Sequence, residues 1–436
     1  MPLSSRIGLL RDPNFRLLFT ATALGQLSDR VIFLALPMVA IVSLKADPFQ
    51  VGLLSATTMA GSLLIGLPAG AWVERMRKRS VMITTDLARA LFLLTIPVAW
   101  ELDLLTIWLL YAVALVHGLF TVFFDVAYVS YLPHLVGRNN LVEGNSKLSA
   151  IRSVTSISGP GVSGPLIGWI GAPATLVASS IGMAASGLFA CGIRNREPEP
   201  APAPHERPRL SRDIMEGLRF VLSYPILRTT MLTDGVFNLF LVMYQTMLMV
   251  FLTRQLGLGA TGTGLILSAM GCGGLLGALL AAGISKRVGP GPVIWIAPLV
   301  TCPLTLVMPM AQPGWTVYVA ALGLVALSLG GVVRLVAQAS FQQALTPDRL
   351  LGRTSATARF VSWGGLALGG LLGGTSGSAF GAAHTLWIAG TGMTLSALPA
   401  LLSPLRTIRA LPLEKDHEQA PEKLSEGIPA DTDQQR

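Results

Sequence analysis

The sequence predicts an all-α polytopic membrane protein in which twelve transmembrane helices form two pseudo-symmetric six-helix bundles. Of its 436 residues, 52% are hydrophobic and only 13% are charged, and the mean hydropathy is +0.61. A soluble domain carries charge on about a quarter of its residues. The apolar residues also gather into long runs, and the pattern of runs repeats from the first half of the chain to the second.

Charged positions and Pro/Gly-rich breaks separate the apolar runs. A helix crosses the bilayer in ~20 residues, because it rises ~1.5 Å per residue through a hydrocarbon core ~30 Å thick. Twelve runs reach this length, at 15–43, 50–72, 80–99, 104–135, 144–170, 172–192, 226–253, 260–284, 291–311, 315–345, 352–378 and 382–403.

An internal repeat relates the two halves. The segment DPNFR at 12–16 is echoed by YPILR at 224–228. Further matched pairs are Gly52 and Gly264, Arg75 and Arg287, Ser130 and Ser340, Gly161 and Gly370, and Gly164 and Gly373. Tandem halves related by an axis along the membrane normal suit a transporter that rocks around a midplane site. We therefore expect a six-helix bundle over 1–192, a cytoplasmic linker with an interfacial helix over 193–223, a second bundle over 224–403 and a disordered cytoplasmic tail over 404–436.

Basic residues gather on one side of the predicted membrane. They lie in the segments 6–16, 75–79, 138–147, 194–219, 286–287, 349–353 and 406–409. The opposite side carries little beyond Lys45 and Arg254. The positive-inside rule then makes both termini cytoplasmic. The net charge of +9 reflects this topology, whereas nucleic-acid binding would need basic residues clustered on a soluble domain.

One basic loop carries a motif. Gly70, Glu74, Arg75, Lys78 and Arg79 form the pattern Gly-x-x-x-Glu-Arg-x-x-Lys-Arg, which resembles the loop signature between the second and third helices of the major facilitator superfamily, where Asp is usual at position 74. The resemblance implies a cytoplasmic gate in which Glu74 and Arg75 bind neighbouring helix ends and stabilise the outward-open state. A carboxylate at position 74 could cap a helix N-terminus. The alternative is that the loop only anchors the topology.

Other stretches resemble the drug:proton antiporter branch of that superfamily, related to macrolide and enterobactin exporters. They are GQLSD at 25–29, ALP at 35–37, DLARA at 86–90 and DVAYVSYLP at 125–133. We group Asp86 and Arg89 of the third stretch with the gating loop. The resemblance implies a monomeric transporter in the bacterial inner membrane that binds a small-molecule substrate and membrane lipid, with the proton gradient in place of any cofactor.

Ionisable residues inside predicted helices are candidate sites, since each costs about 2.5–3.5 kcal/mol on insertion scales. Asp125 and Arg152 lie at similar depth in neighbouring helices, so we expect a salt bridge between them. In the second half, Asp234 can neutralise either Arg334 or Arg359. The cation left over either meets a carboxylate of the other half when the gate closes or meets an anionic group of the substrate.

Asp29 lies deepest among the acids, near the bilayer centre. Burial disfavours the charged form of a carboxyl group, which suits a carrier that binds and releases a proton near neutral pH. We hypothesise that Asp29 carries the coupling proton; the alternative is a static pair with Arg30 or Arg152. His117 titrates in the right range, although a lone histidine among apolar residues is more often a packing residue. The proton-coupling candidates are Asp29, Asp125, Asp234 and His117.

Small and polar residues supply the remaining candidates. Gly159, Pro160 and Gly164, in the stretch GPGVSGP at 159–165, resemble the Gly-Pro signature of the superfamily's antiporters and serve either close helix packing or bending. Candidate substrate-cavity residues, any of which could instead form an interhelical hydrogen bond, are Gln26, Phe33, Asn238, Tyr244, Gln245 and Gln338.

These features predict a secondary transporter that exports a small amphipathic compound, a drug-like natural product or siderophore, by proton-coupled alternating access. Two alternatives are a transporter of lysophospholipid or other lipid, and a non-transporting membrane sensor or scaffold, which the costly buried charges disfavour. An enzyme is excluded because no soluble domain is large enough and no nucleotide-binding loop occurs. Cys191, Cys272 and Cys302 lack metal-ligand spacing, so neither a metal site nor a disulfide is expected.

Overall fold

The structure, a computed structural model, describes residues 8–194, 219, 221–346 and 348–408. Within these residues the chain is helical and contains no strand, which confirms the predicted all-α class. Of the linker with an interfacial helix predicted over 193–223, residues 195–218 and 220 lie outside the described residues. So does the predicted disordered tail beyond Ile408.

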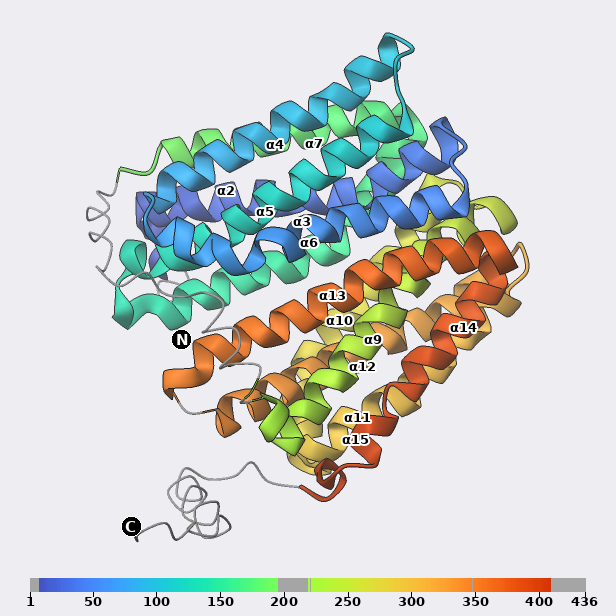
Figure 1. Ribbon diagram of the computed structural model, residues 1–436. Helices are drawn as coiled ribbons and strands as arrows, with labels where there is room; N and C mark the ends of the chain where they lie inside the picture. Colours follow the sequence, from blue (N-terminus) through green and yellow to red (C-terminus); the bar gives the residue numbers. More distant parts are fainter. Residues whose placement is uncertain (1–7, 195–218, 220, 347, 409–436) are drawn as a thin grey trace, which may run out of the picture.

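The first half contains six long helices that run antiparallel in succession (Figure 1). Its elements are η1 (Gly8–Arg11), α2 (Pro13–Met38), the π-helical turn η2 (Val39–Ser43), α3 (Pro48–Glu74), α4 (Lys78–Glu101), α5 (Ile107–Val136), η3 (Arg138–Asn140), α6 (Leu141–Ile170) and α7 (Ala172–Cys191). Capping side chains start three of them: Asp12 at α2, Asp47 at α3 and Thr106 at α5. Asp12 accepts the backbone N–H groups of Asn14 and Phe15 at 2.8 and 3.3 Å, and Asp47 with Gln50 forms a capping box at α3.

The second half repeats this arrangement. Its elements are α9 (Pro225–Val250), the π-helical turn η4 (Phe251–Gln255), α10 (Ala260–Val288), α11 (Pro290–Thr301), η5 (Cys302–Met310), α12 (Thr316–Leu345), α13 (Asp348–Phe380), α14 (Ala382–Leu395), α15 (Leu398–Leu401) and η6 (Pro404–Thr407). Two predicted helices are interrupted because proline lacks an N–H donor. The helix at 291–311 continues beyond Thr301 as the 3₁₀ segment η5 with Pro303 and Pro309, and the helix at 382–403 breaks after Leu395, just before Pro399.

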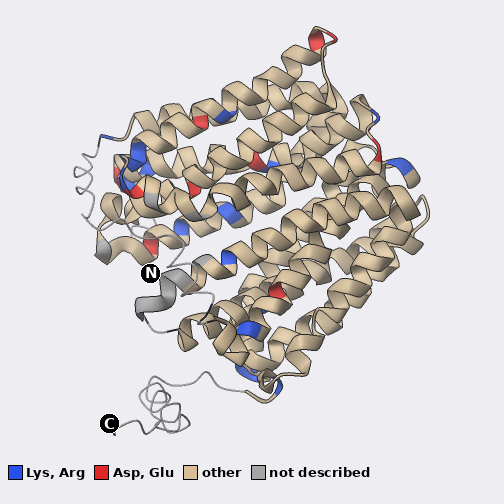
Figure 2. Cartoon of the chain, in the orientation of Figure 1, with Lys and Arg blue, Asp and Glu red and all other residues tan. Residues whose placement is uncertain are grey.

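Nine helices of the described residues are long and apolar enough to cross a membrane, and charged residues are sparse along the helices (Figure 2). The others deviate for identifiable reasons. Helix α6 carries Glu143, Lys147 and Arg152 over its 30 residues, α13 is long but rich in Gly and Ser, and α14 has only 14 residues before the break. The arrangement is consistent with the twelve predicted spans.

We call the end of the bundle where α2 begins the terminal side, and the opposite end, where α2 passes into η2, the far side. On the far side, one hydrophobic core joins the two halves and includes Leu54 of α3 and Leu324 of α12. On the terminal side, the core around Phe15 belongs to the first half and the core around Leu227 belongs to the second. The two halves are therefore joined at the far side and packed separately at the terminal side.

Glycines allow the helices of the two halves to pack closely on the far side. Helices α3 and α13 cross where a Cβ atom on Gly52 would lie 2.4 Å from the Cα atom of Gly374. Helices α6 and α10 cross where a Cβ atom on Gly164 would lie 2.7 Å from the carbonyl oxygen of Ala260. Real Cβ atoms do not approach backbone atoms this closely, so both crossings need glycine.

An arginine also ties the two halves together at the far side. Arg254 of η4 donates from Nη2 to the carbonyl oxygens of Ala46, at 2.6 Å, and Ile41, at 3.3 Å. These carbonyls belong to the end of η2 and the connection that follows it, where a cation is favoured by the helix dipole. Nearer the middle, Thr246 donates to Ser55 across the halves at 3.2 Å.

Gly164→Ala is expected to destabilise the protein by about 1–3 kcal/mol, the usual cost of overpacking, and to loosen the far side. Gly283→Ala is the matched control, because a Cβ atom on Gly283 of α10 meets nothing within 4 Å. The measurements are thermal unfolding and far-side labelling of Thr246→Cys by a membrane-impermeant maleimide, with the three native cysteines changed to serine. Equal behaviour of the two variants would show that the crossing does not hold the far side closed.

Candidate functional site

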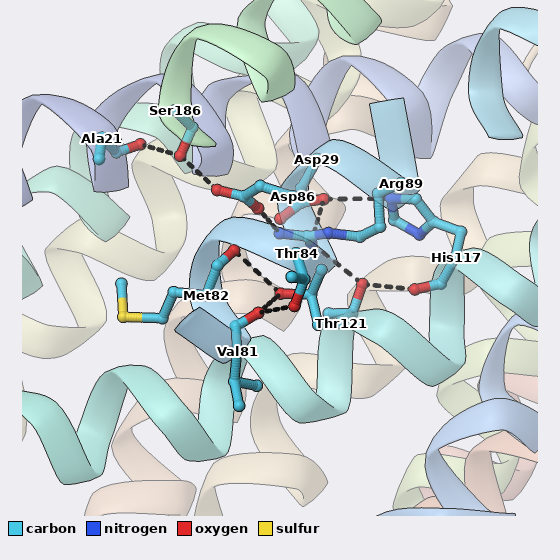
Figure 3. Close-up of polar contacts among 11 residues, drawn as sticks. Ala21, Asp29, Val81, Met82, Thr84, Asp86, Arg89, His117, Thr121 and Ser186 are labelled. Carbon is cyan, nitrogen blue, oxygen red and sulfur yellow. Dashed lines mark hydrogen bonds and ion pairs between the residues drawn. The ribbon is translucent and has the colours of Figure 1, made fainter. Parts of the chain in front are cut away.

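A cluster of charged residues lies inside the first half, between α2, α4 and α5 (Figure 3). Arg89 of α4 lies at its centre and is 1% exposed. Its Nη2 atom pairs with Oδ1 of Asp86, one helical turn earlier, and its Nη1 atom lies 3.4 Å from Oδ1 of Asp29 on α2. His117 of α5 brings Nε2 to 3.3 Å from the same Asp29 oxygen. Two carboxylates therefore share one guanidinium, and a titratable imidazole lies beside one of them.

Neutral groups complete the contacts of the cluster. Arg89 donates to Thr121 Oγ1 at 3.2 Å and lies over the Phe124 ring, 4.8 Å from its centroid. The Ser186 hydroxyl lies 2.6 Å from Asp86 Oδ2 and 2.8 Å from the Ala21 carbonyl oxygen. Asp86 is fully buried, whereas the Asp29 side chain is 32% exposed. The cluster thus has a closed end at Asp86 and an accessible end at Asp29.

Asp29 and His117 lie on the wall of a cavity of about 160 Å³ that both halves line. Phe33 of α2 and Gln245 of α9, two predicted cavity residues, also line it. The remaining wall is mainly apolar, and includes Leu54, Met59, Val242 and Met249. An apolar cavity with a few convergent polar groups is the usual form of a small-molecule site.

The second half holds its own buried ion pair. Arg334 of α12 donates to Asp234 of α9 at 3.0 Å and to Gln338 at 2.7 Å. The other Asp234 oxygen accepts from Asn238 at 3.1 Å and from the Ser362 hydroxyl of α13. Arg334 also lies over the Phe237 ring, 4.2 Å from its centroid, and Gln338 donates to the Thr230 carbonyl oxygen at 3.1 Å. With every carboxylate oxygen engaged, this cluster has the character of a structural brace.

Four further charged residues, Asp125, Arg30, Arg152 and Arg359, are exposed although they lie well inside their helices. The predicted Asp125–Arg152 salt bridge is wrong, since no ion pair joins these two described residues, and Arg152 instead donates to Ser149 Oγ at 3.0 Å. Equal depth did not bring the side chains together, because depth does not fix the direction in which a helix points a side chain.

The alternative prediction of a static ion pair between Asp29 and Arg30 or Arg152 is also wrong. The ion-pair partners of Asp29 are Arg89 and His117, whereas no ion pair within 4.0 Å joins it to Arg30 or Arg152 among the described residues. His117 is therefore more than a packing residue. Asp86 and Arg89 do not belong with the gating loop, because they lie eight and eleven residues into α4, about 12 and 16 Å along its axis.

The loop residues lie at the terminal side. Glu74 ends α3 and Arg75 follows as its C-cap, so Glu74 caps no helix N-terminus, and both side chains are exposed without a hydrogen bond or ion pair in the described part of the chain. Arg79 donates to the carbonyl oxygens of Ala190 and Cys191 at 3.1 and 2.5 Å. Lys78 begins α4. Arg79 thus caps the C-terminus of α7, as the helix dipole favours.

The other predicted cavity and helix residues have separate surroundings. The prediction that Tyr244 lines the cavity is wrong, because its side chain is fully buried and donates to the Thr305 carbonyl oxygen at 2.9 Å. Adjacent helical residues point about 100° apart, so that only Gln245 of this pair faces the cavity. Gln26 is half-buried on α2 and does not line it. Pro160 lies within the continuous helix α6, and Gly159 lies against Arg30 of α2.

Sequence reasoning missed Thr121, Ser186 and Ser362, which bond the buried charges. Serines and threonines are common in membrane helices, so no sequence signal singled these out. A signal did exist for Arg89. Asp86 and Arg89 are three residues apart, which places an acid and a base on one face of an apolar helix.

Comparison with known proteins agrees with this fold. The family model of transmembrane secretion effectors matches residues 4–432. The enterobactin exporter EntS of Salmonella choleraesuis (strain SC-B67) is 27% identical over 423 residues, covering 94% of this chain and 97% of that protein.

Solved structures show the same architecture. A mutant of the nucleoside transporter NupG has a TM-score of 0.75 at 12% identity, covering 89% of this chain and 99% of that one. A bacterial homologue of the iron transporter ferroportin, in an inward-facing state, has a TM-score of 0.72 at 15% identity, covering 92% and 100%. These similar proteins are transporters and not enzymes. The chain therefore belongs to the transmembrane secretion effectors, a family of transporters within the major facilitator superfamily.

Proposed function

We propose that this chain is a monomeric secondary transporter of the bacterial inner membrane that exports a small amphipathic compound in exchange for protons. The observation that carries the proposal is the cavity lined by both halves, with the paired Asp29 and His117 on its wall. An acid and an imidazole in contact with a water-accessible cavity can exchange a proton with the medium. A drug-like natural product or a siderophore suits the mainly apolar wall.

The direction of opening follows from charge and packing together. Basic residues of the terminal side make it cytoplasmic by the positive-inside rule. The far side, where the shared core, the glycine crossings and Arg254 join the halves, is then extracellular. In this arrangement the molecule is open toward the cytoplasm, the state in which an exporter loads its substrate.

Proton release fits the same state. The Arg89 guanidinium lies beside Asp29, and nearby positive charge stabilises a carboxylate over its protonated form. Asp29 therefore gives up its proton while the transporter is open to the cytoplasm. Reloading requires the outward-open state, in which movement of α2 relative to α4 and α5 weakens this pairing.

A susceptibility panel tests the function. Strains that lack the protein, overproduce it or overproduce Asp29→Asn are exposed to amphipathic antibiotics, dyes and siderophores. We expect overproduction to raise tolerance to at least one compound class, and Asp29→Asn, made in equal amount, to raise none. No difference between the two overproducing strains across the panel would contradict the proposal. Movement of a labelled lysophospholipid without a pH gradient would instead identify a lipid transporter.

Glu74→Gln is expected to lower transport about threefold to tenfold, if the loop closes the cytoplasmic side by an interaction worth roughly 1 kcal/mol. Glu74 has no partner in the described residues of the present state, so its interaction forms only on closure. Transport is measured in everted vesicles, with Glu101→Gln as a control, since Glu101 is an exposed acid at the far end of α4. Unchanged transport in Glu74→Gln would reduce the loop to a topological anchor.

A further inference from the structure

Two exposed arginines lie well inside helices of opposite halves. Arg152 lies eleven residues from the start of α6, and Arg359 lies eleven residues from the start of α13. Both positions are about 16 Å from the terminal side at ~1.5 Å per residue. A charged side chain at this depth faces a water-filled space or the bundle interior, because exposure to hydrocarbon is costly.

Asp125 lies near both arginines. It lies eleven residues before the end of α5, at the same depth, and its carboxylate is within electrostatic reach of both Arg152 and Arg359. Asp125 and Arg152 belong to the first half and Arg359 to the second. The three exposed charges therefore lie near one another where the halves meet, on the terminal side, where the two cores are separate.

Arg30 adds a third guanidinium. A Cβ atom on Gly159 of α6 would lie 2.3 Å from the Arg30 Cβ atom, so the base of this side chain lies directly against α6. Gly159 and Arg152 are seven residues apart and share a face of that helix. Arg30 thus lies deeper than Arg152, along the same wall.

The charges of these residues and their neighbours do not balance. Arg89 and Arg334 have carboxylates within 4.0 Å, whereas Arg30, Arg152 and Arg359 have none in the described chain. Asp29, Asp86 and Arg89 together leave one negative charge in excess, and Arg30 offsets it. Asp125 can neutralise either Arg152 or Arg359, but not both, and this stays true if closure brings Asp125 into contact with one of them. One guanidinium of this group is therefore left without a counter-charge among the described residues.

We infer that the transported compound carries an anionic group, a carboxylate, phosphate or other oxyanion, which binds between Arg152 and Arg359. Guanidinium groups bind such oxyanions through paired N–H donors. The apolar part of the compound lies deeper, in the cavity lined by Phe33 and Met249. Asp29, on the cavity wall, lies sixteen residues into α2, so the two subsites are about 8 Å apart along the membrane normal. This inference rests on the proposed transport function and names the substrate class.

A pair of probes with one apolar body tests the inference. Dansylglycine carries a carboxylate, and dansylglycinamide is its neutral counterpart. Binding of each is measured by equilibrium dialysis with the purified protein in phosphatidylcholine nanodiscs. We expect the carboxylate to bind roughly tenfold more tightly than the amide, since the anionic group adds a charge-assisted contact.

The variants separate charge recognition from general damage. Arg152→Gln and Arg359→Gln are each expected to weaken dansylglycine binding about tenfold and to leave the amide unchanged, whereas Arg152→Lys retains part of the preference. Arg406→Gln, at an exposed position on η6, is the matched control and should alter neither. Equal affinity for the two probes, equal losses for both in the variants, or no binding of the anion at millimolar concentration would overturn the inference.

The measurement also separates this inference from the proposed function. Binding needs no gradient and no transport. A retained anion preference with no export in the susceptibility panel would reject the exporter and keep the anion site. Export of neutral compounds with no preference for the anionic probe would reject the anion site and keep the exporter.

Discussion

Arg89→Leu is expected to destabilise the protein by about 3–5 kcal/mol, the usual cost of removing one partner of a buried ion pair. The reason is that Asp86 is fully buried and pairs with Arg89. Without the guanidinium its charge has no compensation beyond the Ser186 hydroxyl. The measurement is the midpoint of thermal unfolding in detergent, followed by fluorescence-detected size-exclusion chromatography.

Two further variants make this result specific. Asp86→Asn in the Arg89→Leu background should recover much of the loss, since the neutral amide can still bond Ser186 and no longer needs a counter-charge. Arg359→Leu removes an arginine at a similar depth but from an exposed position, and should cost much less. If Arg89→Leu is as stable as Arg359→Leu, the cluster does not brace the first half.

Asp29→Asn is expected to abolish the dependence of export on the pH gradient. A coupling free energy of 1–3 kcal/mol corresponds to about 5–150-fold in rate or affinity. The rate of gradient-driven export should therefore decrease by a factor in this range. Substrate exchange without a gradient should persist, because the cavity wall keeps its shape. The measurement is efflux from loaded proteoliposomes with and without an imposed pH gradient, using a compound found by the susceptibility panel.

Asp103→Asn is the control for this variant. Asp103 is an exposed acid in the far-side connection between α4 and α5, with φ of 54°, a conformation that asparagine adopts readily. It should leave coupling unchanged. Coupling that survives intact in Asp29→Asn would reject Asp29 as the proton carrier and direct attention to Asp125.

The sequence predicted the fold well because hydropathy and the spacing of apolar runs are strong one-dimensional signals. The internal repeat also has a structural counterpart. Gly52 and Gly264, matched by the repeat, both lie at crossings between the halves, the first against α13 and the second against α6. The interruptions near Pro303 and Pro399 were missed because a proline-containing run is still apolar.

The site was less predictable, because helical rise gives depth but not direction. Asp234 and Arg334 lie at comparable depth and do pair, whereas Asp125 and Arg152, also matched in depth, are both exposed and form no ion pair with each other. Arg89 was placed with the loop on the strength of its motif, although its distance along α4 put it inside the membrane. Tyr244 and Gln245 differ by one residue and so point to different neighbours, which only packing can decide.

The central claim is that a proton in the Asp29 cluster shifts the molecule between states open on opposite sides. Distances between spin labels test it most directly, in a background without native cysteines. Asn145 and Arg287 form the terminal-side pair, on the ends of α6 and α10, and Asp103 and Gln312 form the far-side pair; all four are exposed.

We expect a change from pH 8 to pH 5.5, about two and a half units spanning the histidine range, to alter the two distance distributions reciprocally, one pair separating as the other closes. In Asp29→Asn the populations should no longer depend on pH in this way. Spin-label distances that do not change with pH when Asp29 is present would contradict the account. So would distances that change in the same direction for both pairs.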